Sequence, residues 1–212
     1  INGAENDNVD GLTYNADDVK EGNILLFTAG ENECDKAVVL TLDNIMSAIS
    51  YINAHCNCTE DDRVLAQIEL SKIFGLLYCL IWPLSCGACI CVGRGLRHID
   101  ADTYYYDATI LPANPSMAEY LKKIKGFNDN LKNIIIGGAP CPYHLYECLR
   151  DRDINVSSVY GTSESTGCIA INYDEDGSYE PFADNTLKLS DDGEILLSGG
   201  CVMKGYYNDE VQ

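Results

Sequence analysis

The sequence predicts an α/β fold: a doubly wound, mostly parallel sheet with helices on both faces, followed by short strands of a smaller, β-rich part. Two observations support this prediction. Short apolar runs such as Lys132–Ile136 and Ile154–Val159 alternate with segments of helical periodicity along most of the chain. The hydrophobic fraction is 46% of 212 residues, which is enough for a sizeable core and excludes wholesale disorder.

The first elements follow a polar, acidic lead-in over residues 1–22. Asn23–Phe27 and Ala37–Leu40 are expected strands on either side of a polar loop. Thr41 is placed to cap a helix that runs to about His55, because apolar residues recur there at helical spacing. A polar turn separates this helix from the next apolar segment.

An uncharged run from Ile73 to Val92 has the length of a membrane span. Pro83 interrupts it, together with glycines, and no basic flank marks a cytoplasmic side. The run is better explained by a buried helix over Leu70–Trp82, a turn and a buried strand. We therefore expect no membrane span.

The chain has 11 cysteines, an odd number, scattered along its length. This pattern favours free thiols in a reducing compartment, so we expect a cytoplasmic protein. Cys86 and Cys89 have the spacing of a redox or metal-binding pair. Because they lie in the expected buried strand, core packing is the favoured interpretation.

The rest of the chain continues the alternation of strands and helices. We expect a strand over Tyr105–Leu111 that ends at Pro112, and a helix from Ser116 to about Lys125 with Glu119 at the capping-box position. The later elements are strand 132–136, helix 143–151, strand 154–159 and short strands near 168–172, 187–189 and 194–197.

The net charge of −19 excludes some classes of partner. A surface this acidic repels phosphate backbones and anionic membranes, so we expect no nucleic acid among the partners. It would also repel a nucleotide unless a local site reverses the field.

The segment Tyr160–Glu164 combines residue types that suit a nucleotide. An aromatic ring offers a platform for a base, and a glycine lets the backbone approach a ligand. Hydroxyl groups can donate to phosphate oxygens, and a carboxylate can hold Mg²⁺. Taken alone, the pattern is weak and is better explained as a turn with a surface glutamate. The loops after Phe27, Ile136 and Val159 all follow strands, and ligands bind beyond the carboxyl ends of parallel strands.

Three segments flank this pattern in a recognisable order: Ile134–Pro140 upstream, and Gly193–Gly199 and Val202–Asp209 downstream. Together they resemble the AMP-forming acyl-CoA synthetase, luciferase and peptide-synthetase adenylation superfamily. The resemblance runs from about Ile24 to Gln212. It implies two-step chemistry, in which a carboxylate attacks the α-phosphate of ATP and a thiol then takes the acyl group from the acyl-adenylate.

The resemblance also implies roles for individual residues. Tyr160 would stack on adenine, Ser163 would serve the phosphate, and Glu164 would bind Mg²⁺. Gly137, Gly138 and Ala139 would line the adenine and acyl pocket. The complete set of expected nucleotide-binding residues is Thr28, Gly30, Gly137, Gly138, Ala139, Pro140, Tyr160, Gly161 and Thr162, and the expected catalytic residues are Lys36, Ser163 and Glu164.

The phosphate loop departs from the pattern of that superfamily. In the matching stretch, Thr28–Ala37, the hydroxyl pair, the second glycine and the proline are missing. Glu31, Glu33 and Asp35 place carboxylates where a triphosphate should rest. One such charge at about 5 Å from a phosphate charge costs about 3 kcal/mol at an effective dielectric constant near 20. ATP binding is badly weakened unless this loop points elsewhere.

The sequence therefore predicts part of an AMP-forming ligase for a fatty or other carboxylic acid, with ATP, Mg²⁺ and coenzyme A or a carrier pantetheine. An acyl carrier protein is a further expected partner. We expect a partial α/β adenylation core over residues 1–172 and the start of a β-rich subdomain over 173–212, without the C-terminal lid and its lysine. The alternative is a degenerate, non-catalytic domain that binds an acyl group or a protein. A plain doubly wound nucleotide-binding domain is a third possibility, which the lack of a glycine-rich first loop disfavours.

Overall fold

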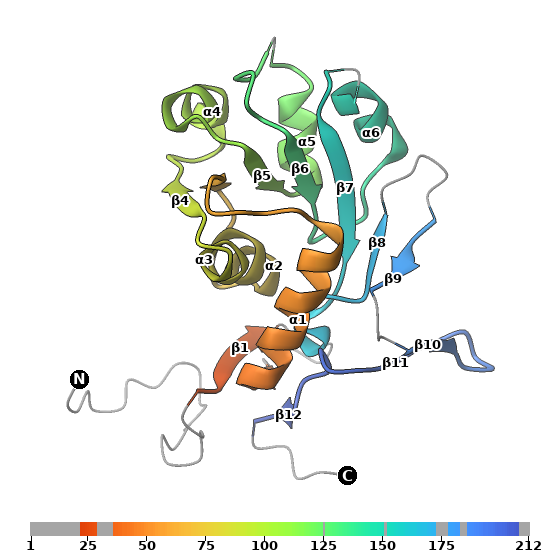
Figure 1. Ribbon diagram of the computed structural model, residues 1–212. Coiled ribbons are helices and arrows are strands. Elements are labelled where there is room, and N and C mark those ends of the chain that lie inside the picture. Colours follow the sequence, from red (N-terminus) through yellow and green to blue (C-terminus); the bar gives the residue numbers. More distant parts are fainter. Residues whose placement is uncertain are drawn as a thin grey trace.

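A computed structural model describes residues 22–28, 36–124, 126–150, 152–172, 178–182 and 186–207 of the chain (Figure 1). Its centre is a seven-stranded sheet with the order β4-β3-β5-β6-β7-β8-β9. The first five strands pair in parallel, whereas β8 and β9 add antiparallel pairs at one edge. The strands are β3 (Arg63–Ala66), β4 (Cys89–Val92), β5 (Ile110–Ala113), β6 (Asn133–Ile136), β7 (Asn155–Tyr160), β8 (Ala170–Asn172) and β9 (Glu180–Pro181).

Helices cover both faces of this sheet, which confirms the predicted doubly wound fold (Figure 1). Because side chains alternate along a strand, neighbouring residues enter different cores. Ile135 packs with one core, and its neighbours Ile134 and Ile136 pack with the other. The first core holds α1 (Leu42–His55), α2 (Ile73–Leu76), η2 (Leu77–Ile81) and α3 (Trp82–Ser85), and the second holds α4 (Ile99–Tyr106), α5 (Pro115–Leu121) and α6 (Tyr143–Arg150).

The first helix begins as predicted at Thr41. The Thr41 side chain accepts a hydrogen bond from the backbone N–H of Asn44, and the Asn44 side chain accepts one from the backbone N–H of Thr41. This capping box satisfies two of the N–H groups that a helix start leaves unpaired. The apolar residues Ile45, Ile49 and Ile52 then face the core.

Two small antiparallel sheets lie outside the main sheet. One joins β1 (Ile24–Thr28), β2 (Lys36–Leu40) and β12 (Gly205–Tyr206) in the order β1-β2-β12. The other pairs β10 (Thr186–Leu189) with β11 (Ile195–Ser198). In Figure 1, β7 points toward the region of β1 and β12. Because β1 pairs antiparallel with β2, Phe27 lies in a strand of a small antiparallel sheet and not in a strand of the parallel sheet.

Four local predictions are wrong. Arg63–Ala66 is a strand that was not expected, and residues up to Tyr106 form α4, so that the expected strand begins only at Ile110. Asn114 caps α5, with its side chain accepting from the Met117 backbone N–H, so Ser116 is not the cap. The cysteine-rich strand β4 is an edge strand in which Cys91 is buried but Cys89 is exposed.

The long uncharged run forms a helical segment and an edge strand. Helical structure extends from Ile73 to Ser85 and contains a π-helical turn at η2. Its largest aromatic side chains, Tyr78 and Trp82, are fully buried against the first core. Within the described residues, no helix is both long enough and apolar enough to cross a membrane.

Candidate functional site

Two of the predicted loops lie side by side at the carboxyl edge of the parallel sheet. Strands β6 and β7 are neighbours, with Ile136 paired in register with Ser158. The glycine-rich loop therefore leaves β6 next to the point where Tyr160 ends β7. Tyr160 is 43% exposed and is T-shaped against Tyr179, with 6.4 Å between the ring centroids. Much of its ring is open to a ligand.

The loop after β6 needs its two glycines for different reasons. A Cβ atom on Gly137 would lie 2.5 Å from Phe74 and 2.8 Å from Val159, so the backbone packs directly against these side chains. Gly138 has a φ of +83°, which side chains other than glycine rarely adopt. Gly138, Ala139 and Pro140 are exposed, which fits the predicted role in lining a ligand pocket.

The loop after β7 is a tight turn that closes on itself. Its first glycine, Gly161, lies so close to the backbone of Gly167 that a side chain would collide with it. Thr162 and Ser165 form a capping box around η4 (Ser163–Ser165). The hydroxyl of Ser163 forms no hydrogen bond with another described residue and is partly exposed. The turn thus presents Thr162 and Ser163 at the surface on a constrained backbone.

The thiol just beyond this turn is a packing group. The side chain of Cys168 is buried, and its sulfur lies 3.9 Å from the Tyr78 hydroxyl. Burial raises the pKa of the Cys168 thiol and that of Tyr78 well above their ordinary values. Both groups stay protonated at neutral pH, so neither acts as a nucleophile there.

Glu164 is held by hydrogen bonds from the segment that contains Met203 and Tyr206. Its carboxylate oxygen Oε1 accepts a hydrogen bond of 2.9 Å from the hydroxyl of Tyr206 in β12. Its backbone carbonyl accepts a further bond of 2.7 Å from the Met203 N–H. The sequence prediction assigned no role to Tyr206, although this residue lies within the quoted segment Val202–Asp209.

The residues at the two ends of the phosphate loop face each other. Thr28 and Lys36 are paired in the β1–β2 hairpin. The Lys36 ammonium lies over the ring of Tyr206, 4.8 Å from its centroid, so Tyr206 contacts two predicted site residues, Lys36 and Glu164. Gly30 and the acidic residues of the loop lie outside the described residues.

The segment from Gly199 to Tyr207 forms hydrogen bonds with the turn at η4, with the β1–β2 hairpin and with α1. The backbone N–H groups of Lys204 and Tyr207 donate to carbonyls of β2, and the Thr166 hydroxyl donates to the carbonyl of Cys201 at 2.7 Å. The Asn44 side chain donates to the carbonyls of Gly200 and Val202, both at 2.8 Å. The turn at η4, the hairpin and α1 therefore share one scaffold.

The residues at this site fit a magnesium ion that is held mainly by its substrate. Mg²⁺ prefers oxygen ligands and is usually bound by one or two carboxylates together with substrate phosphates. The half-buried carboxylate of Glu164 supplies such oxygens, and its only side-chain hydrogen bond among the described residues, from Tyr206, occupies one of them. No cluster of three or more His, Cys, Asp or Glu side chains among those residues could hold a metal by itself.

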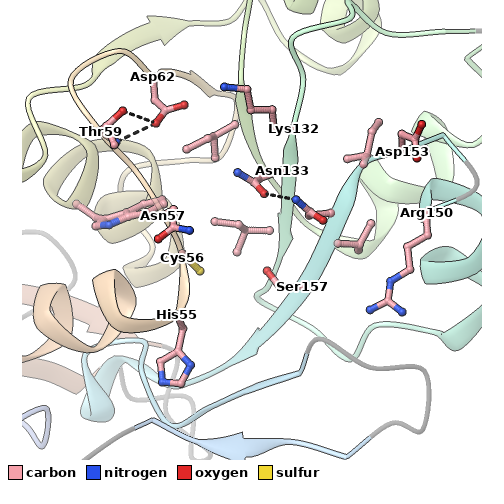
Figure 2. Close-up of a pocket in the computed structure, with 16 residues that line it drawn as sticks. His55, Cys56, Asn57, Thr59, Asp62, Lys132, Asn133, Arg150, Asp153 and Ser157 are labelled. Atoms are coloured by element: carbon pink, nitrogen blue, oxygen red, sulfur yellow. Dashed lines mark hydrogen bonds between the residues drawn. The ribbon is translucent and has the colours of Figure 1, made fainter.

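A large cavity lies elsewhere, at the amino ends of the parallel strands. Its volume is about 740 Å³, and Figure 2 shows it between the end of α1 and the starts of β6 and β7. Asn155 donates to Asn133 at 3.3 Å on its wall. Burial would raise the pKa of Asp62 at its rim, but hydrogen bonds from Thr109 and Thr59 outweigh burial and lower it. None of the predicted site residues that the structure describes lines this cavity.

Comparison with known proteins gives a family match over nearly all of the described chain. The family model for "AMP-binding enzyme" matches residues 24–207. Acyl-CoA synthetase ALT10 of Alternaria alternata is 30% identical over an alignment of 244 residues, which covers 92% of this chain and 43% of the relative. The chain thus spans less than half the length of this relative.

Solved structures share the fold. The inhibitor-bound N-terminal domain of FACL13 from Mycobacterium tuberculosis matches with a TM-score of 0.79 at 20% identity, covering 88% of this chain and 52% of that one. The o-succinylbenzoate coenzyme A synthetase MenE of Bacillus subtilis, solved with ATP and a magnesium ion, matches with a TM-score of 0.77 at 23% identity. That match covers 88% of this chain and 43% of the MenE chain.

Proposed function

Because the chain belongs to the AMP-binding enzyme family, we propose that it is part of an AMP-forming ligase that activates a carboxylic acid with ATP and Mg²⁺ and passes it to a thiol. A fatty acid is the proposed substrate, and coenzyme A or a carrier pantetheine is the proposed acceptor. The observation that carries the proposal is that Tyr206 contacts both Lys36 and Glu164 beside the end of β7. The Lys36 ammonium lies over its ring, and its hydroxyl donates to the Glu164 carboxylate.

In the proposed reaction, a carboxylate oxygen of the acid forms a bond to the α-phosphorus of ATP, and pyrophosphate leaves. The thiol sulfur then bonds to the acyl carbon, AMP leaves, and the thiol proton passes to solvent. Mg²⁺, when bound, supplies charge neutralisation on the phosphates. Such chemistry depends on positioning and electrostatic stabilisation rather than on a protein nucleophile.

The residues of this chain would bind and orient the nucleotide. The exposed ring of Tyr160 would stack on adenine, while Gly138 and Ala139 would let the base and the acyl group approach the backbone. Ser163 would donate a hydroxyl to the phosphate, and Glu164 would hold the metal. We also assign Thr28, Gly30, Pro140, Gly161 and Thr162 to the nucleotide site, as the sequence predicts.

We propose that residues 1–172 belong to the α/β core and that residues 173–212 begin a β-rich subdomain, with a lid supplied by further chain. In the structure, β9 still pairs with the main sheet, while β10 and β11 form their own pair. An acyl carrier protein as acceptor and a cytoplasmic location complete the proposal.

A second candidate function is a non-catalytic domain that binds an acyl group or a protein partner. The observation that favours it is the set of carboxylates at Glu31, Glu33 and Asp35 in the phosphate loop. ATP–pyrophosphate exchange by the natural full-length protein, with a panel of carboxylic acids, separates the two. Acid-dependent exchange above background supports the ligase. No exchange with any acid, combined with no thermal shift on adding ATP and Mg²⁺, contradicts it.

A further inference from the structure

Tyr206 lies between two residues that the proposed function assigns to the triphosphate. Its hydroxyl donates to Glu164 Oε1 at 2.9 Å, and the Lys36 ammonium lies 4.8 Å from its ring centroid. The three residues come from β12, η4 and β2, which are far apart in the sequence. One tyrosine thus contacts both the cation at the end of the phosphate loop and the candidate metal ligand.

The hydrogen bond restricts the carboxylate. A glutamate side chain has several rotamers, and without a partner it would sample them. A hydroxyl that donates to an ionised carboxylate forms a charge-assisted bond, which is stronger than a neutral one. Because Tyr206 takes Oε1, the other oxygen of Glu164 is left for a metal ion. Among the described residues, no Lys or Arg forms an ion pair with Glu164.

The backbone on both sides fixes where the Tyr206 hydroxyl lies. Tyr206 pairs in register with Val38 of β2, and the Tyr207 N–H donates to the Ala37 carbonyl at 2.7 Å. On the other side, the Met203 N–H donates to the carbonyl of Glu164 itself at 2.7 Å. The tyrosine and the glutamate are therefore held by main-chain bonds in the same small region, so their contact is built into the fold.

The position of Lys36 adds an electrostatic reason for an aromatic ring here. The chain carries a net charge of −19, so a bound triphosphate needs every local cation. A ring face attracts an ammonium without neutralising its charge. A carboxylate partner would hold Lys36 equally well but would cancel the charge that phosphate needs.

We propose that Tyr206 is a positioning residue, which orients the Glu164 carboxylate for Mg²⁺ and keeps Lys36 beside it. This inference rests on the proposed function and assigns Tyr206 no direct contact with the reacting atoms. It predicts that the Tyr206 hydroxyl matters only when Mg²⁺ is present and only when residue 164 can bind it.

The test is the Mg²⁺ dependence of ATP affinity in the natural full-length protein, measured by displacement of a fluorescent ATP analogue. Tyr206→Phe keeps the ring for Lys36 and removes the hydroxyl. We expect the Mg²⁺ concentration for half-maximal ATP binding to rise about tenfold, as for loss of a charge-assisted hydrogen bond. Binding measured with EDTA should not change. The matched control is Tyr104→Phe, which removes a remote hydroxyl that donates to the Phe127 carbonyl at 2.8 Å.

A double-mutant cycle identifies the residue through which the hydroxyl acts. In a Glu164→Gln background, Tyr206→Phe should cause no further rise in the Mg²⁺ requirement. Thermal unfolding without nucleotide checks that each variant is folded.

Three outcomes would overturn the inference. An unchanged Mg²⁺ requirement in Tyr206→Phe, with normal binding in the wild type, contradicts this role alone. If Tyr206→Phe loses as much ATP affinity with EDTA, or in the Glu164→Gln background, the hydroxyl contributes to packing and not to Mg²⁺ binding through Glu164. A wild-type protein that binds no Mg²⁺–ATP at all contradicts the proposed function, and the role of Tyr206 fails with it.

Discussion

The side-chain amide of Asn44 lies 2.8 Å from the carbonyl oxygen of Val202, although 158 positions separate the two residues. The same amide nitrogen donates to Gly200, while the carbonyl oxygen of the Asn44 side chain caps α1. One buried side chain therefore connects the first helix to the segment that carries Tyr206. This contact explains how residues at opposite ends of the described chain form one site.

The first prediction tests this connection. Asn44→Ala removes the capping-box partner and leaves the carbonyls of Gly200 and Val202 without their donor. Two lost hydrogen bonds and a weakened cap should lower the free energy of unfolding by about 2–3 kcal/mol. Urea unfolding measures it. The control is Asn57→Ala, at an exposed position, which should change stability by less than about 0.5 kcal/mol. Equal losses of unfolding free energy in the two variants would show that the Asn44 contacts do not stabilise the fold.

A second prediction concerns the turn after β7. Gly161→Ala places a Cβ atom against the backbone of Gly167 and Cys168, which cannot move as a side chain can. We expect a loss of about 2–3 kcal/mol in unfolding free energy, as for overpacking. At Gly138 a Cβ would meet open space, so Gly138→Ala should cost only the left-handed backbone, about 1 kcal/mol. A reversed order of the two losses in urea unfolding would contradict the packing.

The third prediction is a pH dependence of stability. The buried side chain of Asp102 forms an ion pair with Arg94, whose own side chain is 55% exposed. Although burial would raise the pKa of Asp102, hydrogen bonds and charge from Arg94 lower it below the ordinary value of 3.8. A carboxyl group with a lowered pKa in the folded state stabilises the protein above its unfolded pKa. That contribution is lost as the pH falls from about 5 through the pKa of the folded state.

Urea unfolding between pH 7 and pH 3 checks this dependence. Asp102→Asn should be less stable than the wild type at pH 7, and the difference should shrink toward pH 3. Asp100→Asn, in the same helix, serves as the control, since the Asp100 side chain forms no hydrogen bond or ion pair with another described residue. A constant difference between Asp102→Asn and the wild type at all pH values would show that ionisation of Asp102 is not the cause.

A fourth prediction concerns the candidate metal ligand. Glu164→Gln keeps an acceptor for the Tyr206 hydroxyl but removes the negative charge. If Glu164 holds Mg²⁺ on the phosphates, acid-dependent ATP–pyrophosphate exchange should fall about 100-fold, the scale seen when one electrostatic stabiliser is removed. Glu147→Gln, an exposed position on α6, should leave exchange unchanged. Near-normal exchange by Glu164→Gln would exclude this residue as the metal ligand.

The sequence predicted the fold class because its signals were strong and local. Thr41 capped the first helix as expected, and the isoleucines of β6 formed a strand with both faces buried. Arg63–Ala66 was missed because this short strand follows a polar turn and begins with a charged residue. The tyrosines near Tyr106 favour a strand by propensity, but they lie in α4, whose buried side is formed by Ile99, Asp102 and Thr103.

Pro112 shows a second reason for an error. Proline lacks the N–H that a central strand needs, so the expected strand ended before it. In the structure, Pro112 pairs with Ile135 of β6, and the ladder to β3 involves only Ile110. The missing donor therefore costs no ladder bond on the β3 side. Such a local gap in pairing cannot be predicted from composition or spacing.

The candidate site was predictable in part. The residues around Tyr160 and Gly137 were identified from their pattern, and the structure places their loops beside each other. The role of Tyr206 could not be predicted, because it depends on the antiparallel pairing of β12 with β2. That pairing joins segments from the two ends of the described chain, and no local signal reveals it.

Whether the protein forms an acyl-adenylate is tested most directly by labelling the carboxylate oxygen atoms of the acid. If the protein forms an acyl-adenylate, a carboxylate oxygen of the acid bonds to the α-phosphorus and stays with AMP after the thiol has taken the acyl group. The natural full-length protein should be incubated with ATP, Mg²⁺, coenzyme A and an ¹⁸O-labelled acid that supports exchange. Mass spectrometry should find one ¹⁸O atom in each AMP formed. Unlabelled AMP, or ADP with the label in phosphate, would contradict the formation of an acyl-adenylate.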